Sequence, residues 1–317
     1  MPNEFDLIAK YFTRPTPNTD LGIGDDAALL SISTNNQLVI SVDASVVGTH
    51  FYPDCPAEFV GWKSLAVNVS DMAAMGATPK WITLAIALPV QDADWLTGFA
   101  RGFFACAEQF NLDLIGGDTT RGSLNITVQI MGEVLKGKAL LRSGAQAGDD
   151  VWVSGLLGSA ALGLAHLQNK ITLPDDVLEV CSNALNQPQP RIALGLGLLG
   201  VANSCIDISD GLVGDLAHIL QASGVGAELD LDAIPCLPLM KTAMELPVYQ
   251  QAVLAGGDDY ELCFTAPADQ RSRIKALGES LALPLTRVGQ ITAKAGLKVM
   301  HHGHVLPLQM RGFDHFA

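Results

Sequence analysis

The stretch LNITVQIMGEV, residues 124–134, decides the fold class of this chain. Apolar and polar side chains alternate in it from Leu124 to Ile130, so the apolar ones share one face of a strand. A strand with one buried face and one more polar face is typical of an antiparallel sheet. Helices and strands around it mix without strict β-α-β alternation, which predicts an α+β fold rather than a doubly wound sheet.

Segments on both sides of this strand complete the predicted organisation. The first half is expected to hold strands at 38–43, 81–88 and 112–118 and helices at 5–12, 56–76 and about 92–110. The segment KGKALLRSGAQAGDD at 136–150 breaks the pattern, so we predict an N-terminal domain at 1–140 and a C-terminal domain at 141–317. The second domain opens with the strand VWVSG and a helix at 158–168, and CIDISDG, AELDLD, YELCFTA and PLTRVGQ supply further strands.

The composition limits the partners of the chain. Of its 317 residues 49% are hydrophobic, and 19 basic against 33 acidic residues leave a net charge of −14. Such a chain lacks the basic surface that binds nucleic acid or an anionic membrane, so we expect neither partner. No apolar stretch reaches the roughly 18 residues of a membrane-spanning helix, and the charged N-terminus lacks the core of a signal peptide. Six cysteines without a C-x-x-C pair indicate buried reduced thiols in a cytoplasmic protein.

Aspartates recur beside glycines and at predicted strand ends. Asp26 follows Gly-Ile-Gly, Asp43 ends a predicted strand, and Asp118 follows Gly-Gly. Any one of them could be a helix cap or turn former, but the whole set favours a site, because gathered carboxylates repel one another unless protons or cations join them. Oxygen-only ligands suit Mg²⁺, whose shell is usually completed by substrate phosphates. Aspartates in similar positions are Asp71, Asp207, Asp210, Asp258 and Asp259.

Standard nucleotide-binding motifs do not account for the chain. It has no P-loop signature, and GIGDDA at 22–27, a formal match to a dinucleotide fingerprint, would place two aspartates against a pyrophosphate and repel it. A second formal match, GLGLLG at 195–200, follows no predicted strand. We therefore expect the glycines of GLGLLG to permit close helix packing.

Longer motifs resemble the thiamine-monophosphate kinase family of the aminoimidazole-ribonucleotide-synthetase-like superfamily. They occur in the family's order along nearly the whole chain, which makes the resemblance highly specific. They are GIGDDAALL (22–30), SVD and GTHF within 41–51, LAVNVSDMAAMGATP (65–79), IGGDTTRG (115–122), RSGAQAGD (142–149), IDISDGL (206–212), GGDDYELCF (256–264) and GFDHF (312–316).

The resemblance implies a cytoplasmic enzyme that moves the γ-phosphoryl group of ATP onto thiamine monophosphate and forms thiamine diphosphate. It implies a homodimer in which the sheets of the N-terminal domains pair, while a mixed α/β C-terminal domain closes the cleft for nucleotide and substrate. Several Mg²⁺ ions would assist the transfer. No general base is expected, because a phosphate monoester with a second pKa near 6 is already mostly a dianion at neutral pH.

The family's site residues are carried over position by position. The resemblance assigns Mg²⁺ to Asp26, Ser41, Val42, Asp43, Asp71, Asp118, Asp207 and Asp210, with Val42 acting through its carbonyl. It assigns ATP contacts to Gly117, Asp118, Arg142 and Ser209. It assigns the thiamine-phosphate pocket to His50, Asp258 and Phe313.

Three positions depart from the family pattern. Val42 stands where threonine is common and keeps only the carbonyl, and Asp258 stands where glutamate is common and has a shorter reach. Phe313 stands where tyrosine or tryptophan is common; it retains an aromatic face for a cationic or heterocyclic ring but loses a hydrogen bond.

Two other functions remain open at this point. Another ATP-dependent synthetase of the same superfamily would use a similar set of aspartates, although a selenophosphate-type enzyme should carry a cysteine in an early glycine-rich loop, and the first cysteine here is Cys55. A non-enzymatic acidic metal-binding protein is the second alternative. The chain has no EF-hand loop, and its acids are scattered along the sequence, which suits a folded site better.

Overall fold

The computed structural model describes residues 4–307. The chain divides into two compact units, of which the first comprises residues 1–72 and 77–137 and the second comprises residues 73–76 and 138–317. Each unit has a sheet of its own, and strands and helices do not alternate strictly in either. The predicted α+β class is therefore confirmed.

The sheet of the first unit has the order β1-β4-β2-β3, so the strand predicted at 124–134 lies inside it as β4. β4 is antiparallel to both of its neighbours, as its alternating pattern predicts, and β2 and β3 are parallel to each other. The strands are β1 (Asn36–Val46), β2 (Thr78–Leu88), β3 (Asp113–Arg121) and β4 (Asn125–Leu135).

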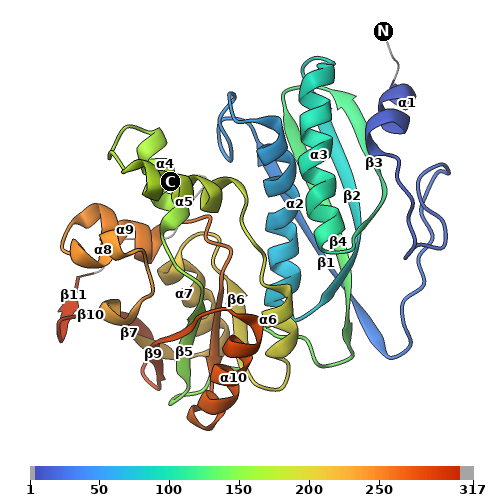
Figure 1. Ribbon diagram of the computed structural model, residues 1–317. Helices are drawn as coiled ribbons and strands as arrows, with labels where there is room; N and C mark the ends of the chain where they lie inside the picture. Colours follow the sequence, from blue (N-terminus) through green and yellow to red (C-terminus); the bar gives the residue numbers. More distant parts are fainter. Residues whose placement is uncertain (1–3, 308–317) are drawn as a thin grey trace. The chain divides into compact units, whose positions relative to one another are not determined.

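Two long helices, α2 (Ala57–Ala74) and α3 (Ala93–Gln109), lie on one face of this sheet (Figure 1). Asp92 caps α3, because its side chain accepts hydrogen bonds from the first free N–H groups of the helix. Phe99 and Phe103 on α3 are fully buried and stack with their ring centroids 5.7 Å apart. The helix backbones approach closely at Gly102, where a Cβ atom would lie 1.8 Å from the carbonyl oxygen of Glu58.

Replacing Gly102 with alanine is expected to destabilise the first unit. The two helices would have to separate, which should cost about 3 kcal/mol and lower the melting temperature by roughly 6–10 °C. Thermal unfolding followed by circular dichroism measures the shift. Gly98→Ala in the same helix is the control, because its nearest new contact would be the Ala57 Cβ at 3.2 Å. Equal melting temperatures for the two variants would contradict this packing.

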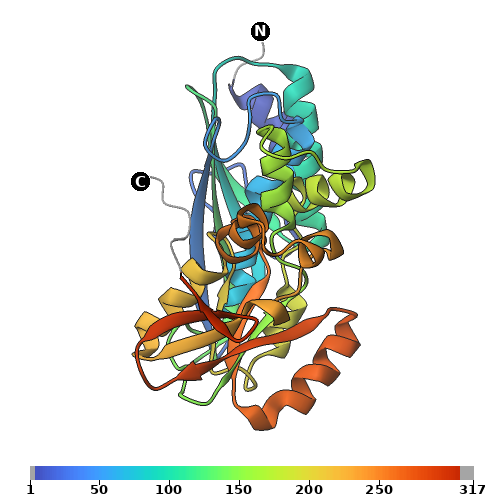
Figure 2. The same ribbon diagram turned by 90° about the vertical axis from the view of Figure 1, so that its left-hand side faces the viewer.

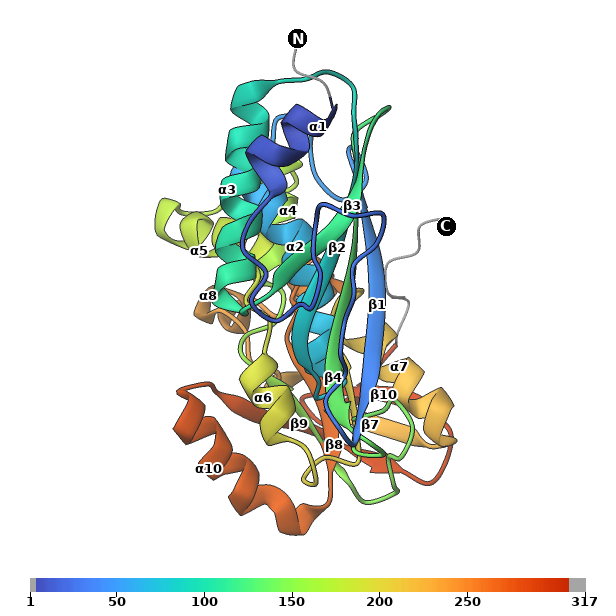
Figure 3. The same cartoon turned by 90° about the vertical axis from the view of Figure 1, so that its right-hand side faces the viewer.

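The helix predicted at 5–12 is present, but its second half has π geometry. α1 (Glu4–Leu7) continues into η1 (Ile8–Phe12), and the ring of Phe12 packs edge-on against Phe99. The segment that follows runs beside β3 (Figure 3). Asn18 holds it there, because its N–H donates to Asp113 (2.6 Å) and its carbonyl accepts from Trp81 Nε1 (2.8 Å).

The sheet of the second unit has seven strands in the order β11-β10-β7-β9-β5-β8-β6. Its red C-terminal strands can be followed in Figure 2. β7 and β10 are parallel, and the other neighbours are antiparallel. The strands are β5 (Asp150–Ser154), β6 (Ser204–Asp207), β7 (Gly226–Asp230), β8 (Leu262–Ala266), β9 (Leu285–Thr292), β10 (Gly296–His301) and β11 (His304–Leu306).

Both faces of this sheet are covered. Val151 and Val153 of β5 belong to a core shared with α7, whereas Trp152 between them belongs to a core shared with α6 and α10. Gly195 on α6 confirms the close packing predicted for GLGLLG, since a Cβ atom there would lie 2.0 Å from the Ala73 carbonyl oxygen. The helices are α4 (Ser159–Leu167), α5 (Asp175–Asn186), α6 (Ile192–Gly197), α7 (Leu212–Ser223), η2 (Leu231–Ala233), α8 (Pro238–Thr242), α9 (Pro247–Ala255), η3 (Ala268–Gln270) and α10 (Arg271–Leu281).

None of the six cysteines forms a disulfide bond, as their spacing predicts. Five are buried and Cys55 is partly exposed. Among residues 4–307, no helix has the length and apolar character needed to cross a membrane.

Candidate functional site

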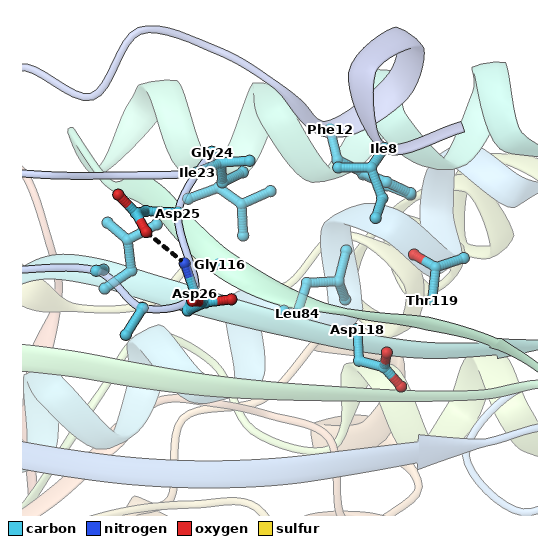
Figure 4. A pocket seen from close by; sticks show the side chains of 15 residues that line it. Ile8, Phe12, Ile23, Gly24, Asp25, Asp26, Leu84, Gly116, Asp118 and Thr119 are labelled. Atoms are coloured by element: carbon cyan, nitrogen blue, oxygen red, sulfur yellow. Dashed lines mark hydrogen bonds between the residues drawn. The ribbon is translucent and has the colours of Figure 1, made fainter. Parts of the chain in front are cut away.

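A cavity of about 530 Å³ lies in the first unit where β3 forms the edge of the sheet (Figure 4). Asp26, Gly117 and Asp118 all line it, so the structure brings three of the predicted site residues together. The apolar side chains of Ile8 and Phe12 form another part of the wall. The volume is in the range of small-molecule sites, and both polar and apolar groups are available to a ligand.

Gly117 lets the strand pass its neighbour at close range. Its φ is +155°, and a Cβ atom at this position would lie 1.8 Å from the Leu84 carbonyl oxygen. Asp118 is the next residue and is exposed. It lies within β3, so the prediction that Asp118 ends the strand was wrong; the strand continues to Arg121.

A second acidic group lies where β1 meets α2. The Ser41 hydroxyl donates to the Asp71 carboxylate (2.5 Å), and Asp43 forms a side-chain hydrogen bond with Asp71. Burial raises the pKa of Asp43 to about 7, and the charge of Asp71 adds to this rise. Two carboxylates in this arrangement share a proton, and a divalent cation could replace it. Asp43 lies inside β1, which extends to Val46, and not at the predicted strand end.

These two groups belong to opposite edges of one sheet. β1 and β3 are separated by β4 and β2, which corresponds to three strand spacings, or about 14 Å. Mg²⁺ binds its oxygen ligands at about 2.1 Å. Asp43 and Asp118 of one chain are therefore too far apart to bind the same ion.

A third group of predicted residues lies on the loop between β6 and α7 of the second unit. Asp207 ends β6, and Ser209 and Asp210 follow before the helix begins. The buried Asp215 holds this loop, because one of its oxygens accepts hydrogen bonds from the N–H groups of Ser209, Asp210 and Gly211 at 3.0–3.1 Å. Burial raises the pKa of Asp215 to about 7, and these N–H groups oppose the rise.

The segment that carries Asp258 packs beside this loop. The Asp258 N–H donates to the Ser209 carbonyl (2.9 Å), and the Tyr260 N–H donates to the Ile208 carbonyl (2.8 Å). Asp258 and Tyr260 both have positive φ, 68° and 49°, which non-glycine residues adopt rarely. The structure thus brings Asp258 together with Asp207, Ser209 and Asp210.

The remaining predicted residues lie outside these groups. Val42 points its side chain to solvent, with 57% exposed, and the His50 ring accepts a hydrogen bond from the Val46 N–H (3.0 Å) in the loop after β1. Arg142 is exposed in the segment before β5, where its carbonyl accepts from Ser223 Oγ (3.3 Å). Phe313 lies outside the described residues.

The sequence reasoning missed the buried residues that support the second-unit groups. Asp215 is one, and its position four residues after Gly211, in the first turn of a helix, was an available signal. Glu261 is another: it is buried and forms a two-pronged ion pair with Arg191. Asp259, which the sequence analysis named among the aspartates, supports the backbone, since its carboxylate accepts from the Gly158 N–H at 2.9 Å. Such pairing between distant segments leaves no local pattern.

Comparison with known proteins identifies the family. The model of the AIR synthase related protein N-terminal domain matches residues 24–134, and that of the C-terminal domain matches residues 146–302. A thiamine-monophosphate kinase of Escherichia coli (strain K12) is 45% identical over 320 residues, which cover 99% of this chain and 98% of that protein. This chain belongs to the thiamine-monophosphate kinase family. The family expected from the motifs is thereby confirmed.

Solved structures of thiamine-monophosphate kinases have the same architecture. The enzyme from Stenotrophomonas maltophilia K279a is 46% identical with a TM-score of 0.84, and the match covers 95% of each chain. The structure of AaThiL complexed with AMPPCP and TMP is 29% identical with a TM-score of 0.78 and covers 98% of this chain and 96% of that one. The predicted fold of two AIR-synthase-type domains is therefore confirmed.

Proposed function

We propose that this chain phosphorylates thiamine monophosphate to thiamine diphosphate, with ATP as the phosphoryl donor. The observation that carries the proposal is the full-length identity of 45% to a thiamine-monophosphate kinase, combined with the acidic groups on β1, β3 and the β6–α7 loop. AMPPCP is an ATP analogue, and its presence together with TMP in the AaThiL complex supports both substrates. The same identity favours this kinase over another synthetase of the superfamily.

The acidic groups fit Mg²⁺ by the chemistry of their donors. They offer carboxylate, hydroxyl and carbonyl oxygens, which Mg²⁺ prefers, and Asp43 and Asp71 are already close enough to share a proton. When bound, Mg²⁺ would neutralise the phosphate charges and hold the two substrates in line. The proposed ligands are Asp26, Ser41, Val42, Asp43, Asp71, Asp118, Asp207 and Asp210.

The other assigned residues would bind the two substrates. Gly117 and Ser209 would donate backbone or hydroxyl hydrogen bonds to ATP, and Arg142 would pair with its phosphates, for which a planar guanidinium is well suited. His50 and Asp258 would contact thiamine monophosphate. Phe313 would offer a ring face to the thiazolium or the pyrimidine.

The chemistry requires positioning more than proton transfer. Thiamine monophosphate is a phosphate monoester and mostly a dianion at neutral pH, so its oxygen is nucleophilic without a general base. The obstacle is charge repulsion, about 4 kcal/mol for each pair of unit charges 4 Å apart at an effective dielectric constant of 20. Preorganised cation ligands that hold the two anions together address this obstacle, and the transfer would be direct.

We further propose that the working form is a homodimer. Leu38, Ile40 and Val42 alternate along β1 on one face of the sheet and are 40–57% exposed, although they are large and apolar. An exposed apolar row of this kind is typical of a surface covered by a partner. Asp43 lies on the opposite face of β1 from this row. If the β1 edge of one chain meets the β3 edge of its partner when the two apolar rows pack, Asp43 would lie near position 118 of the partner.

The acidic groups and the apolar row on β1 suggest a role for each domain. The domain at 1–140 would bind metal and ATP and form the dimer, and the domain at 141–317 would close the site for nucleotide and substrate. The cytoplasm is the proposed location, since ATP is supplied there and the six cysteines form no disulfide bond.

Formation of thiamine diphosphate from ATP and thiamine monophosphate, separated by chromatography, tests the proposal. Turnover is expected with Mg²⁺ and is expected to disappear when the ion is chelated. ATP consumption without thiamine diphosphate formation, in the presence of a formylglycinamidine substrate, would instead support the synthetase alternative. Absence of any thermal stabilisation by ATP with Mg²⁺ would argue for the non-enzymatic alternative.

A further inference from the structure

Two histidines and two carboxylates form a cluster in the second unit, and none of them has a role in the proposed reaction. His301 and His302 lie at the hairpin between β10 and β11, Asp232 lies in η2, and Glu245 lies in the turn between α8 and α9. We refer to these four residues as the histidine cluster. They come from three separate segments, so only the fold brings them together.

The hairpin turn places the two imidazoles on the same side of the chain. Successive side chains of a strand point to opposite faces, so adjacent histidines would normally diverge. Here His301 pairs with His304 across a two-residue turn, in which His302 and Gly303 have φ of 49° and 78°. These left-handed values are those of a tight hairpin turn. As a result the rings stack, with centroids 4.1 Å apart and an interplanar angle of 26°.

Asp232 joins the two rings at their Nδ1 edge. One carboxylate oxygen lies 2.8 Å from His301 Nδ1, and the other lies 3.3 Å from His302 Nδ1. The His302 backbone N–H also donates to this carboxylate (2.8 Å) and fixes its orientation. Burial opposes ionisation, but the His302 N–H and the neighbouring imidazoles hold the pKa of Asp232 below its usual range.

Glu245 lies at the opposite edge of the rings. Its Oε1 is 3.1 Å from His301 Nε2, within hydrogen-bond distance, and 3.6 Å from His302 Nε2. With a cation between Asp232 and the two Nδ1 atoms, the ring proton of His301 would lie on Nε2, where Glu245 accepts it. Metal-binding histidines commonly donate their second N–H to a carboxylate in this way.

We propose that His301, His302 and Asp232 bind a divalent transition-metal ion of the Zn²⁺ type. One ligand atom from each residue lies within 4.8 Å of the others. In tetrahedral zinc sites, with bonds of 2.0–2.1 Å, ligand atoms lie about 3.4 Å apart. Side-chain rotations that unstack the rings and turn both Nδ1 atoms toward Asp232 would complete the geometry. The His301 side chain is only 10% exposed, whereas that of His302 is 68% exposed, so the site is anchored on one side and open to solvent on the other.

The donor set separates this site from the Mg²⁺ ligands of the proposed reaction. Two imidazole nitrogens and one carboxylate suit Zn²⁺ and its neighbours, whereas Mg²⁺ prefers oxygen ligands. The bound ion joins the β10–β11 hairpin to η2, which lies about 70 residues earlier in the chain. Neither segment contains a residue assigned to Mg²⁺ or ATP. The ion therefore stabilises the second unit without taking part in phosphoryl transfer.

Calorimetric titration of the full-length protein with ZnCl₂, in the presence of excess MgCl₂, tests the site. Mg²⁺ occupies the oxygen-only groups and leaves the histidine cluster available. We expect the wild-type protein to bind one Zn²⁺. The His301→Ala and His302→Ala variants should bind Zn²⁺ at least tenfold more weakly. His304→Ala is the matched control, because this exposed histidine belongs to the same hairpin but not to the cluster, and it should bind like wild type. Glu245→Ala should weaken binding about tenfold.

The same variants report on stability. Zn²⁺ should raise the melting temperature of wild type and of His304→Ala but not that of His302→Ala. The exposed His302 can be replaced with little risk to folding, so this variant keeps the test decisive if His301→Ala fails to fold. Equal Zn²⁺ binding by wild type and His302→Ala would overturn the proposal and leave the cluster as a set of ion pairs. So would the absence of any binding by wild type.

Discussion

A mixture of Asp43→Ala and Asp118→Ala chains should regain turnover that neither variant has alone. Each change by itself removes a proposed Mg²⁺ ligand, and turnover should fall at least about 10³-fold because the repulsion between the phosphates is no longer neutralised. The two aspartates lie on opposite edges of one sheet, about 14 Å apart. If each site takes Asp43 from one chain and the other aspartate from its partner, a mixed dimer contains one intact site and one that lacks both ligands.

Co-expression of the two variants with different affinity tags allows the mixed dimer to be isolated and assayed. Half of the wild-type turnover per dimer is expected. The matched control is a mixed dimer of Asp43→Ala with Asp71→Ala. These two residues share a hydrogen bond within one chain, so both sites of that dimer stay defective. An inactive mixed dimer of Asp43→Ala with Asp118→Ala would show that the site is not shared between chains. Near-normal turnover of either single variant would refute a role of the replaced aspartate in metal binding.

Loss of Asp215 should impair catalysis although this residue is not expected to touch a substrate. Its carboxylate holds three N–H groups of the loop that carries Ser209 and Asp210. Asp215→Ala leaves one buried and two part-buried N–H groups unpaired, which should cost about 2–4 kcal/mol of stability. It also releases the loop, and displacement of proposed ligands by about 1 Å should lower turnover roughly 10²-fold.

A positioning role for Asp215 is distinguished from simple destabilisation by its kinetics. The apparent Mg²⁺ and ATP requirements of Asp215→Ala should rise at temperatures where the variant is fully folded by circular dichroism. Asp215→Asn retains one oxygen acceptor and should recover part of the loss. Glu179→Ala, on the exposed face of α5, provides the control and should leave both stability and kinetics unchanged. Unaltered kinetics in folded Asp215→Ala would contradict the proposed role.

Local patterns predicted most elements of the fold. The alternation in 124–134 predicted β4 to within one residue at each end, because one face of that strand is buried and the other is not. The helix expected at 92–110 forms α3, since Asp92 caps it and its apolar side chains recur at helical spacing. The strands containing Asp43 and Asp118 are longer than predicted, because pairing with β4 and β2 extends them beyond their apolar residues.

The residues of the candidate site were predicted by resemblance, but their grouping required the structure. Motif resemblance supplied most of the site's residues by number, and the structure then sorted them into three groups, on β3, on β1 with α2, and on the β6–α7 loop. Asp215 and Glu261 were not predicted, because their roles depend on partners 4 and 70 positions away. The histidine cluster was also missed, since its carboxylates come from η2 and from the turn before α9.

The family, the fold class and a set of oxygen ligands suited to Mg²⁺ could be predicted from the sequence, because motifs, periodicity and charge are properties of neighbouring residues. Which strands form the edges of the first sheet, and therefore that Asp43 and Asp118 of one chain are separated, required the folded molecule. Strand order is set by hydrogen bonding and burial between segments far apart along the chain, and such long-range pairing is not encoded in any single stretch of residues.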